Sequence, residues 1–172
     1  GAAIGIVLGY LLAAKVSTAG VLAVLGAITV FFAGQRLWLS RGGRVEAAKD
    51  SPAAVGVMFG VIAGFTSQIA HVGAPPFQMW VAPKRLAPLL MIGTSSLFFF
   101  IINWLKVPAY IALGQFTTEN LMTAAVLLPV AIGSTFAGVW LVRRIEAERL
   151  YRLIYFLMLA VGVQLLWKAF AG

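Results

Sequence analysis

The sequence predicts an all-α fold: a polytopic transmembrane helical protein with inverted repeats and a re-entrant broken helix. The first observation is composition, because 62% of the 172 residues are hydrophobic and only 10% are charged, whereas a soluble domain carries about 25% charged residues. The second is that the charges are bunched, which leaves long apolar runs. A run of about 20 apolar residues crosses a hydrocarbon core of ~30 Å. The third is a break rich in Gly and Pro inside one of these runs, at residues 73–76.

Six apolar units follow one another along the chain, and each predicts a helix. The first is shorter than a full span, and because Gly1 already lies inside it, we expect the sequence to be the later part of a longer chain. No helix continues through the prolines after the third unit, since proline lacks an amide donor. The units are 1–14, 19–39, 53–72, 86–105, 121–142 and 151–170, with a short apolar piece at 77–81 and a weakly polar stretch at 106–120.

The positions of the basic residues favour one topology. If all six units crossed the membrane, the basic loop at 40–52 and the basic turn at 143–149 would face opposite sides, against the positive-inside rule. If the third unit instead enters, breaks and returns to the side it came from, ten of the 13 basic residues share that side. We therefore predict a re-entrant hairpin, although residues 53–72 are long enough, at about 30 Å, to span alone. The predicted cytoplasmic loops are 40–50, 84–85 and 143–149, with Gly172 outside and Lys15, Lys106 and Lys168 on the other side.

An internal repeat accompanies this topology. A repeat of one re-entrant hairpin plus three crossings crosses the membrane an odd number of times. Two consecutive copies therefore lie inverted in the membrane, as in many secondary transporters. The sequence thus divides into the tail of a first repeat at 1–39, a cytoplasmic linker at 40–52 and a second repeat at 53–172. At an offset of 128 to 129 residues, Ala3-Ile4-Gly5, Gly9, Gly34 and Trp38 recur as Ala131-Ile132-Gly133, Gly138, Gly162 and Trp167.

The third unit carries a stripe of small and polar residues. Gly56, Gly60 and Gly64 lie four residues apart on one helix face, where small residues let a second helix approach closely. Ser67 and His71 continue the same face. Packing alone explains the glycines, but polar and ionisable groups at membrane depth are costly and usually face a cavity or pathway. We therefore predict a function for the polar end of the stripe.

The break after this stripe predicts an anion site. Backbone groups freed where one helix ends near Val72 and another restarts after Pro76 are tolerated only beside protein or a water-filled cavity. The restarted helix would present its partial positive charge from about Phe77 and Gln78, and no acidic residue lies in any predicted span. His71 would carry a proton with the substrate or donate a hydrogen bond to it. The predicted substrate-binding residues are Ser67, Gln68, His71, Gly73, Pro75, Pro76, Gln78, Thr94, Ser95 and Asn103.

Around these residues the sequence resembles the second half-motif of the sulfite exporter TauE/SafE family. The resemblance covers 52–172 as a complete second repeat and 1–39 as the tail of the first, and Ala74 stands where the family usually has a second glycine. It implies a secondary transporter of small organic or sulfur-containing anions (sulfite, sulfonates or related carboxylates) in the bacterial inner, cytoplasmic membrane. The residues that carry it are the run from Gly64 to Gln78, Pro83-Lys84-Arg85-Leu86, Gly93-Thr94-Ser95, Asn103-Trp104 and the run from Tyr110 to Phe116.

Enzyme classes fit the sequence less well than a transporter. Ala70-His71-Val72-Gly73 is similar to the His motif of rhomboid proteases, but these need a Gly-x-Ser-Gly nucleophile on an earlier span, and none precedes His71. A metalloenzyme needs several His or carboxylate ligands, and the chain has one His. Thiol chemistry is excluded because the chain has no cysteine. We therefore predict no enzyme, no cofactor and no metal site, and keep a membrane channel or a non-transporting assembly subunit as the alternative.

The predicted partners follow from the same observations. The net charge is +8, and the basic residues that produce it lie between the apolar spans, where they set the topology. We therefore predict no nucleic-acid partner. The remaining partners are the small anionic substrate, the lipid bilayer and the preceding N-terminal half of the same chain, and a homo-oligomer is left open.

Overall fold

The computed structural model describes residues 1–40, 52–114 and 116–171, and every regular element in these ranges is a helix. Most of the predicted linker therefore lies outside the described residues. The prediction of an all-α protein is confirmed. The elements are α1 (Ala2–Leu12), α2 (Thr18–Ser40), α3 (Ala53–Ala70), α4 (Ala74–Val81), the 3-10 helix η1 (Ala82–Lys84), α5 (Pro88–Ala112), α6 (Thr118–Val142) and α7 (Ala147–Ala171).

Five of these helices, α2, α3, α5, α6 and α7, are long and apolar enough to cross a membrane. Three of their boundaries differ from the prediction by three residues or more. α5 continues through Pro108 to Ala112, α6 begins at Thr118 rather than at residue 121, and α7 begins at Ala147 rather than at residue 151. Pro108 removes one amide donor, but the residues around it remain mostly apolar, so the helix goes on. Thr117 caps α6 by accepting a hydrogen bond from the amide of Asn120 at 3.2 Å.

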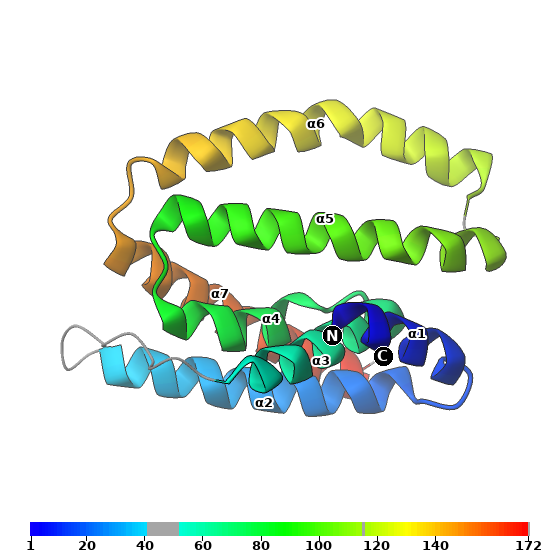
Figure 1. The fold of residues 1–172 in the computed structure, drawn as a ribbon, viewed down its shortest axis with the longest axis horizontal. Coiled ribbons are helices and arrows are strands. Elements are labelled where there is room, and N and C mark those ends of the chain that lie inside the picture. Colours follow the sequence, from blue (N-terminus) through cyan, green and yellow to red (C-terminus); the bar gives the residue numbers. More distant parts are fainter. Residues whose placement is uncertain (41–51, 115, 172) are drawn as a thin grey trace.

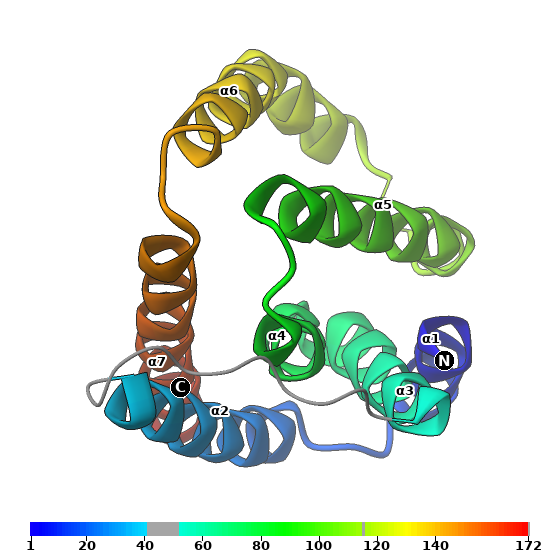
Figure 2. The same cartoon turned by 60° about the vertical axis from the view of Figure 1, so that its left-hand side comes forward.

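Two helix pairs form the packed part of the molecule, and glycines let each pair approach closely. α1 packs along α3, and α2 packs along α7 (Figure 2). A Cβ on Gly64 would clash with the carbonyl oxygen of Ala2, and a Cβ on Gly162 would lie 3.0 Å from the amide nitrogen of Val30. The packing role predicted for the glycine stripe is therefore confirmed at Gly64, where α1 is the second helix.

α6 lies on the outer side of α5, away from α2, in both views (Figure 1, Figure 2). Only 6% of its most apolar 18-residue window is buried. Large side chains such as Val126 and Phe136 are more than 70% exposed. An apolar surface of this extent is unfavourable in water, and it is expected where a helix faces lipid or another helix.

The predicted helix break is present between α3 and α4. α3 ends at Ala70, and His71 takes a left-handed conformation (φ 59°, ψ 25°) that terminates the helix. The next helix begins at Ala74, so Pro75 and Pro76 occupy its first turn. The expected restart after Pro76 is therefore wrong. Prolines fit into a first turn because the amides there have no intrahelical partner.

α3 and α4 form a hairpin that returns to the end of the molecule from which it starts (Figure 1). After η1, Arg85 forms an ion pair with Glu148 of α7 at 2.8 Å, and Tyr151 donates a hydrogen bond to the carbonyl oxygen of Leu86 at 2.8 Å. The end of the hairpin is thereby held at the start of α7. The predicted hairpin is therefore present, whereas its re-entry in a membrane, the inverted repeat and the cytoplasmic orientation stay predictions. The described basic residues near the ends of α2, η1 and α6 and the start of α7, called the basic end below, are Arg36, Lys84, Arg85, Arg143, Arg144, Arg149 and Arg152.

Cysteine labelling tests this topology, because the chain has no cysteine of its own. In the re-entrant arrangement, Lys15 in the turn after α1 and Lys84 in η1 lie on opposite sides of the membrane. We expect an impermeant thiol reagent to label Lys84→Cys from the cytoplasmic side only and Lys15→Cys from the other side only, in vesicles of known orientation. The cysteine-free chain is the control. Labelling of both variants from one side would mean that α3 and α4 together cross the membrane.

Candidate functional site

Polar side chains gather where α3 ends, beside the ends of α1 and α5. A cavity of about 240 Å³ lies there. Because it borders the α1–α2 turn, the tip of the hairpin lies toward the end of the molecule opposite the basic end (Figure 1). The lining residues are Tyr10, Ala13, Thr18, Gln68, Ile69, His71, Tyr110 and Leu113.

Lys106, in α5, brings a buried charge to this region. It is 4% exposed, and its ammonium group donates hydrogen bonds to the hydroxyl (3.1 Å) and the carbonyl oxygen (3.5 Å) of Ser67. That carbonyl belongs to the last turn of α3, where carbonyls lack helical partners and the helix dipole is negative. Within the described ranges no carboxylate pairs with Lys106. A buried ammonium without a counter-charge costs several kcal/mol, so an anion bound here would be stabilising.

The prediction that the span ends at residue 105, with Lys106 at the start of a weakly polar stretch, is wrong, whereas the side of the membrane assigned to Lys106 stays a prediction. α5 continues beyond it, so Lys106 stands inside the helix, one turn before Tyr110. It shares a face with Met91 and Ile102, which are each 1% exposed. The sequence gives no signal that Lys106 faces the hairpin, because only the structure shows which residues of this apolar helix are buried. Tyr10 and Thr18, which stand near the ends of other helices, carry no such signal either.

His71 and Tyr110 connect the helix break to α5. Nε2 of His71 and the hydroxyl of Tyr110 are 3.0 Å apart, within hydrogen-bond distance, and the two rings stack with their centroids 6.0 Å apart. Nζ of Lys106 lies over the same tyrosine ring, 5.5 Å from its centroid. His71 is exposed whereas Lys106 is buried. The lysine therefore forms the deep part of this corner, and the histidine forms its accessible part.

Two further predicted residues support the same corner. Gln68 lines the cavity at 8% exposure, and its side-chain oxygen has no hydrogen-bond partner among the described residues. An orphaned buried polar atom of this kind calls for a water or a ligand. Gly73 packs directly on the end of α3, because a Cβ there would lie 2.8 Å from the carbonyl oxygen of Ala63 and 2.9 Å from Cβ of Ser67. Glycine at this position thus allows the chain to turn tightly beside Ser67.

The other predicted residues do not line this cavity. The hydroxyl of Ser95 is used within its own helix, donating to the carbonyl oxygen of Met91 at 2.8 Å. Asn103 is exposed on α5, and the side-chain oxygen of Gln78 is buried without a partner among the described residues. The structure brings Ser67, Gln68 and His71 together with Lys106, and the binding role of the remainder stays a prediction. Of the predicted residues, Gln68 and His71 line the cavity, and those outside its lining are Ser67, Gly73, Pro75, Pro76, Gln78, Thr94, Ser95 and Asn103.

The left-handed backbone of His71 gives a test of this geometry. A residue with a Cβ pays about 1–2 kcal/mol in this conformation, and glycine does not. We expect His71→Gly to be more stable than His71→Ala by about 1 kcal/mol, the reverse of the usual helix preference. The unfolding midpoint in detergent measures the difference, and both variants lose the contact with Tyr110. A more stable alanine variant would show that α3 does not end at residue 71.

The family model of the sulfite exporter TauE/SafE family matches residues 1–165. The chain belongs to this family. Membership, together with the five helices able to cross a membrane, indicates a multi-pass membrane transporter protein of the class that moves sulfur anions. The resemblance seen around the helix break is therefore confirmed. No curated protein and no solved structure matches this TauE/SafE chain.

Proposed function

We propose that this TauE/SafE protein binds a small anion at Ser67, His71, Lys106 and Tyr110, called the anion corner below, and carries it across the cytoplasmic membrane of a bacterium. The anion would be sulfite, a small sulfonate or a related carboxylate. The observation that carries the proposal is the ammonium group of Lys106, buried beside the helix break with no carboxylate partner among the described residues. Ionisable residues at membrane depth usually serve a substrate or an ion pathway.

The chemistry of the anion corner favours an anion over a cation. The ammonium group, the serine and tyrosine hydroxyls and the imidazole can all donate hydrogen bonds. The residues that line the cavity include no Asp or Glu. Hydrogen bonds from an ammonium group to an oxyanion are about twice as strong as neutral ones. Lys106 would therefore supply most of the affinity, and the other donors would orient the ligand.

The size of the cavity supports a small substrate. Its volume is about 240 Å³, and one water molecule takes up about 30 Å³ of the liquid. A sulfur oxyanion with a few waters fits this space, while a bulky organic anion does not. Gln68, whose side-chain oxygen is unpartnered, would bind one of these waters.

An arriving anion would compete with α3 for the ammonium group of Lys106. The contact with the Ser67 carbonyl oxygen, at 3.5 Å, is at the outer limit for a hydrogen bond and is the weaker of the two. Lys106 can exchange it for an oxyanion while it keeps the contact with the Ser67 hydroxyl, which then donates its own proton to the anion. We assign His71 a hydrogen-bonding role, because the anion corner holds no carboxylate that would relay a proton onward.

Flux measurements in proteoliposomes test this proposal. The wild-type chain should move sulfite with saturable kinetics. Ser67→Ala should raise the half-saturation concentration about fivefold, because it removes one hydrogen bond worth about 1 kcal/mol, and it should leave the pH profile unchanged. His71→Gln keeps a donor but does not titrate, so a hydrogen-bonding role predicts an unchanged pH dependence and a proton-carrying role predicts its loss.

Ser96→Ala is the matched control for Ser67→Ala, because Ser96 is exposed on α5, whereas Ser67 is buried against the ammonium group of Lys106. It should transport like the wild type. If Ser67→Ala and His71→Gln also transport like the wild type, the anion corner is not the binding site. Flux that does not saturate would indicate a channel, and absence of flux from a folded protein would indicate an assembly subunit.

A further inference from the structure

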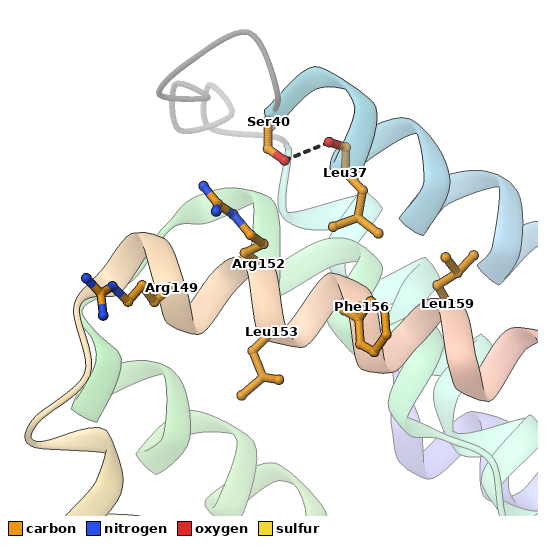
Figure 3. Close-up of a pocket in the computed structure, with 7 residues that line it drawn as sticks. All are labelled: Leu37, Ser40, Arg149, Arg152, Leu153, Phe156 and Leu159. Atoms are coloured by element: carbon orange, nitrogen blue, oxygen red, sulfur yellow. Dashed lines mark hydrogen bonds between the residues drawn. The ribbon is translucent and has the colours of Figure 1, made fainter.

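A second cavity lies at the basic end, between the last turn of α2 and the first half of α7 (Figure 3). Its volume is about 810 Å³, more than three times that of the cavity at the anion corner. In the last turn of α2, the hydroxyl of Ser40 donates a hydrogen bond to the carbonyl oxygen of Leu37 at 2.7 Å. The lining residues are Leu37, Ser40, Arg149, Arg152, Leu153, Phe156 and Leu159.

The lining residues change from charged to apolar along α7. Arg149 and Arg152 stand near the start of the helix, and Leu153, Phe156 and Leu159 follow toward its middle (Figure 3). Phe156 is 60% exposed and Leu153 is 41% exposed. Because α7 can cross a membrane, its charged start belongs at the membrane surface and its apolar middle in the hydrocarbon core. The cavity therefore has a polar end and an apolar end in the order in which a phospholipid has them.

The polar end of the cavity carries positive charge that the described residues neutralise only weakly. Glu148 is bound to Arg85, outside the cavity, at 2.8 Å. Glu146 lies 3.1 Å from Arg149, but both side chains of this pair are more than 70% exposed, and exposed pairs are weak. Arg152 has no carboxylate partner within the described part of the chain. A guanidinium group can bind a phosphate through two hydrogen bonds.

We propose that this cavity binds an anionic phospholipid. The phosphate would lie on Arg149 and Arg152, and one acyl chain would cover Leu153, Phe156 and Leu159. Basic pockets between transmembrane helices recognise anionic lipid headgroups in this way. The apolar half of the cavity favours a lipid over a free phosphate ion, which would leave Phe156 uncovered. This site is separate from the anion corner and does not depend on which anion is transported.

Thermal unfolding of the full chain in detergent, with lipids added, tests the site. Phosphatidylglycerol should raise the unfolding midpoint in a concentration-dependent way, as any ligand of the folded state does, and phosphatidylcholine with the same acyl chains should not. Arg149→Gln combined with Arg152→Gln should weaken the apparent affinity for phosphatidylglycerol about 30-fold, which is about fivefold for each arginine. Arg143→Gln combined with Arg144→Gln is the matched control, because it removes the same charge from the basic end outside the cavity.

Two further measurements separate a lipid from other ligands. Glycerol phosphate carries the same phosphate without acyl chains, so it should not raise the midpoint. Phe156→Ala should weaken the response to phosphatidylglycerol by removing the apolar wall, and it serves as the test if the double arginine variant does not fold. The proposal is overturned if the Arg149/Arg152 variant keeps the full response, if the Arg143/Arg144 control loses as much, or if glycerol phosphate acts like the lipid.

Discussion

Lys106→Met should weaken the apparent affinity for sulfite by roughly 10- to 100-fold in proteoliposome flux. Methionine keeps an unbranched apolar side chain but removes the ammonium group that donates to Ser67. A hydrogen bond to a charged group contributes about 1.5–3 kcal/mol, which corresponds to that change in affinity. Lys106→Arg keeps the charge and should retain part of the transport. The half-saturation concentration for sulfite is the quantity to measure.

Lys168→Met is the control for this substitution, because Lys168 is exposed in the last turn of α7. It should leave the half-saturation concentration unchanged. Lys106 also satisfies a carbonyl at the end of α3, so the unfolding midpoint has to be recorded beside the flux. A Lys106→Met variant that is less stable but binds sulfite like the wild type would show that Lys106 only caps α3, and it would contradict the anion corner.

Gly64→Ala should destabilise the protein by about 1–2 kcal/mol, and Gly64→Leu should destabilise it further. Alanine is normally the better helix former by about 1 kcal/mol. At Gly64, however, the added Cβ clashes with the backbone carbonyl of Ala2, which cannot move without separating α1 from α3. Overpacking of this kind costs about 1–3 kcal/mol. The unfolding midpoint followed by tryptophan fluorescence in detergent measures the loss.

Gly133→Ala is the matched control, because Gly133 lies in the middle of α6 with nothing within 4 Å of its added Cβ. It should be neutral or slightly stabilising, so the same chemical change has opposite effects at the two sites. Equal midpoints for Gly64→Ala and the wild type would mean that α1 does not pack on the glycine stripe.

Apart from the end of α5, the long helices could be predicted from the sequence to within a few residues. A membrane span must be apolar over its whole length, whatever it packs against, so the runs at 19–39 and 151–170 correspond closely to α2 and α7. The helix break could be predicted for a similar reason, because Pro75 and Pro76 prevent continuation of α3. The start of the next helix could not, because two prolines are equally compatible with a linker and with a first helical turn.

Only part of the anion corner could be predicted from the sequence. Ser67, Gln68 and His71 stood out because polar residues are unusual on an apolar helix. Lys106 follows a long apolar run, and a lysine in that position also marks the end of a span. Tyr110, one turn further on, falls in a stretch that the same reasoning places outside the membrane.

The sequence by itself determined the all-helical class, the spans, the break between α3 and α4 and the basic end, because each depends on the hydrophobicity and backbone chemistry of a short stretch of chain. Only the tertiary structure decided that Lys106 is buried against Ser67, 39 residues earlier in the chain. A lysine after an apolar run can lie in water at the end of a helix or be buried inside the protein. It is buried only where another part of the chain supplies a hydrogen-bond acceptor for its ammonium group. Here that acceptor is the carbonyl end of α3, at Ser67, which the α3–α4 hairpin carries to the side of α5.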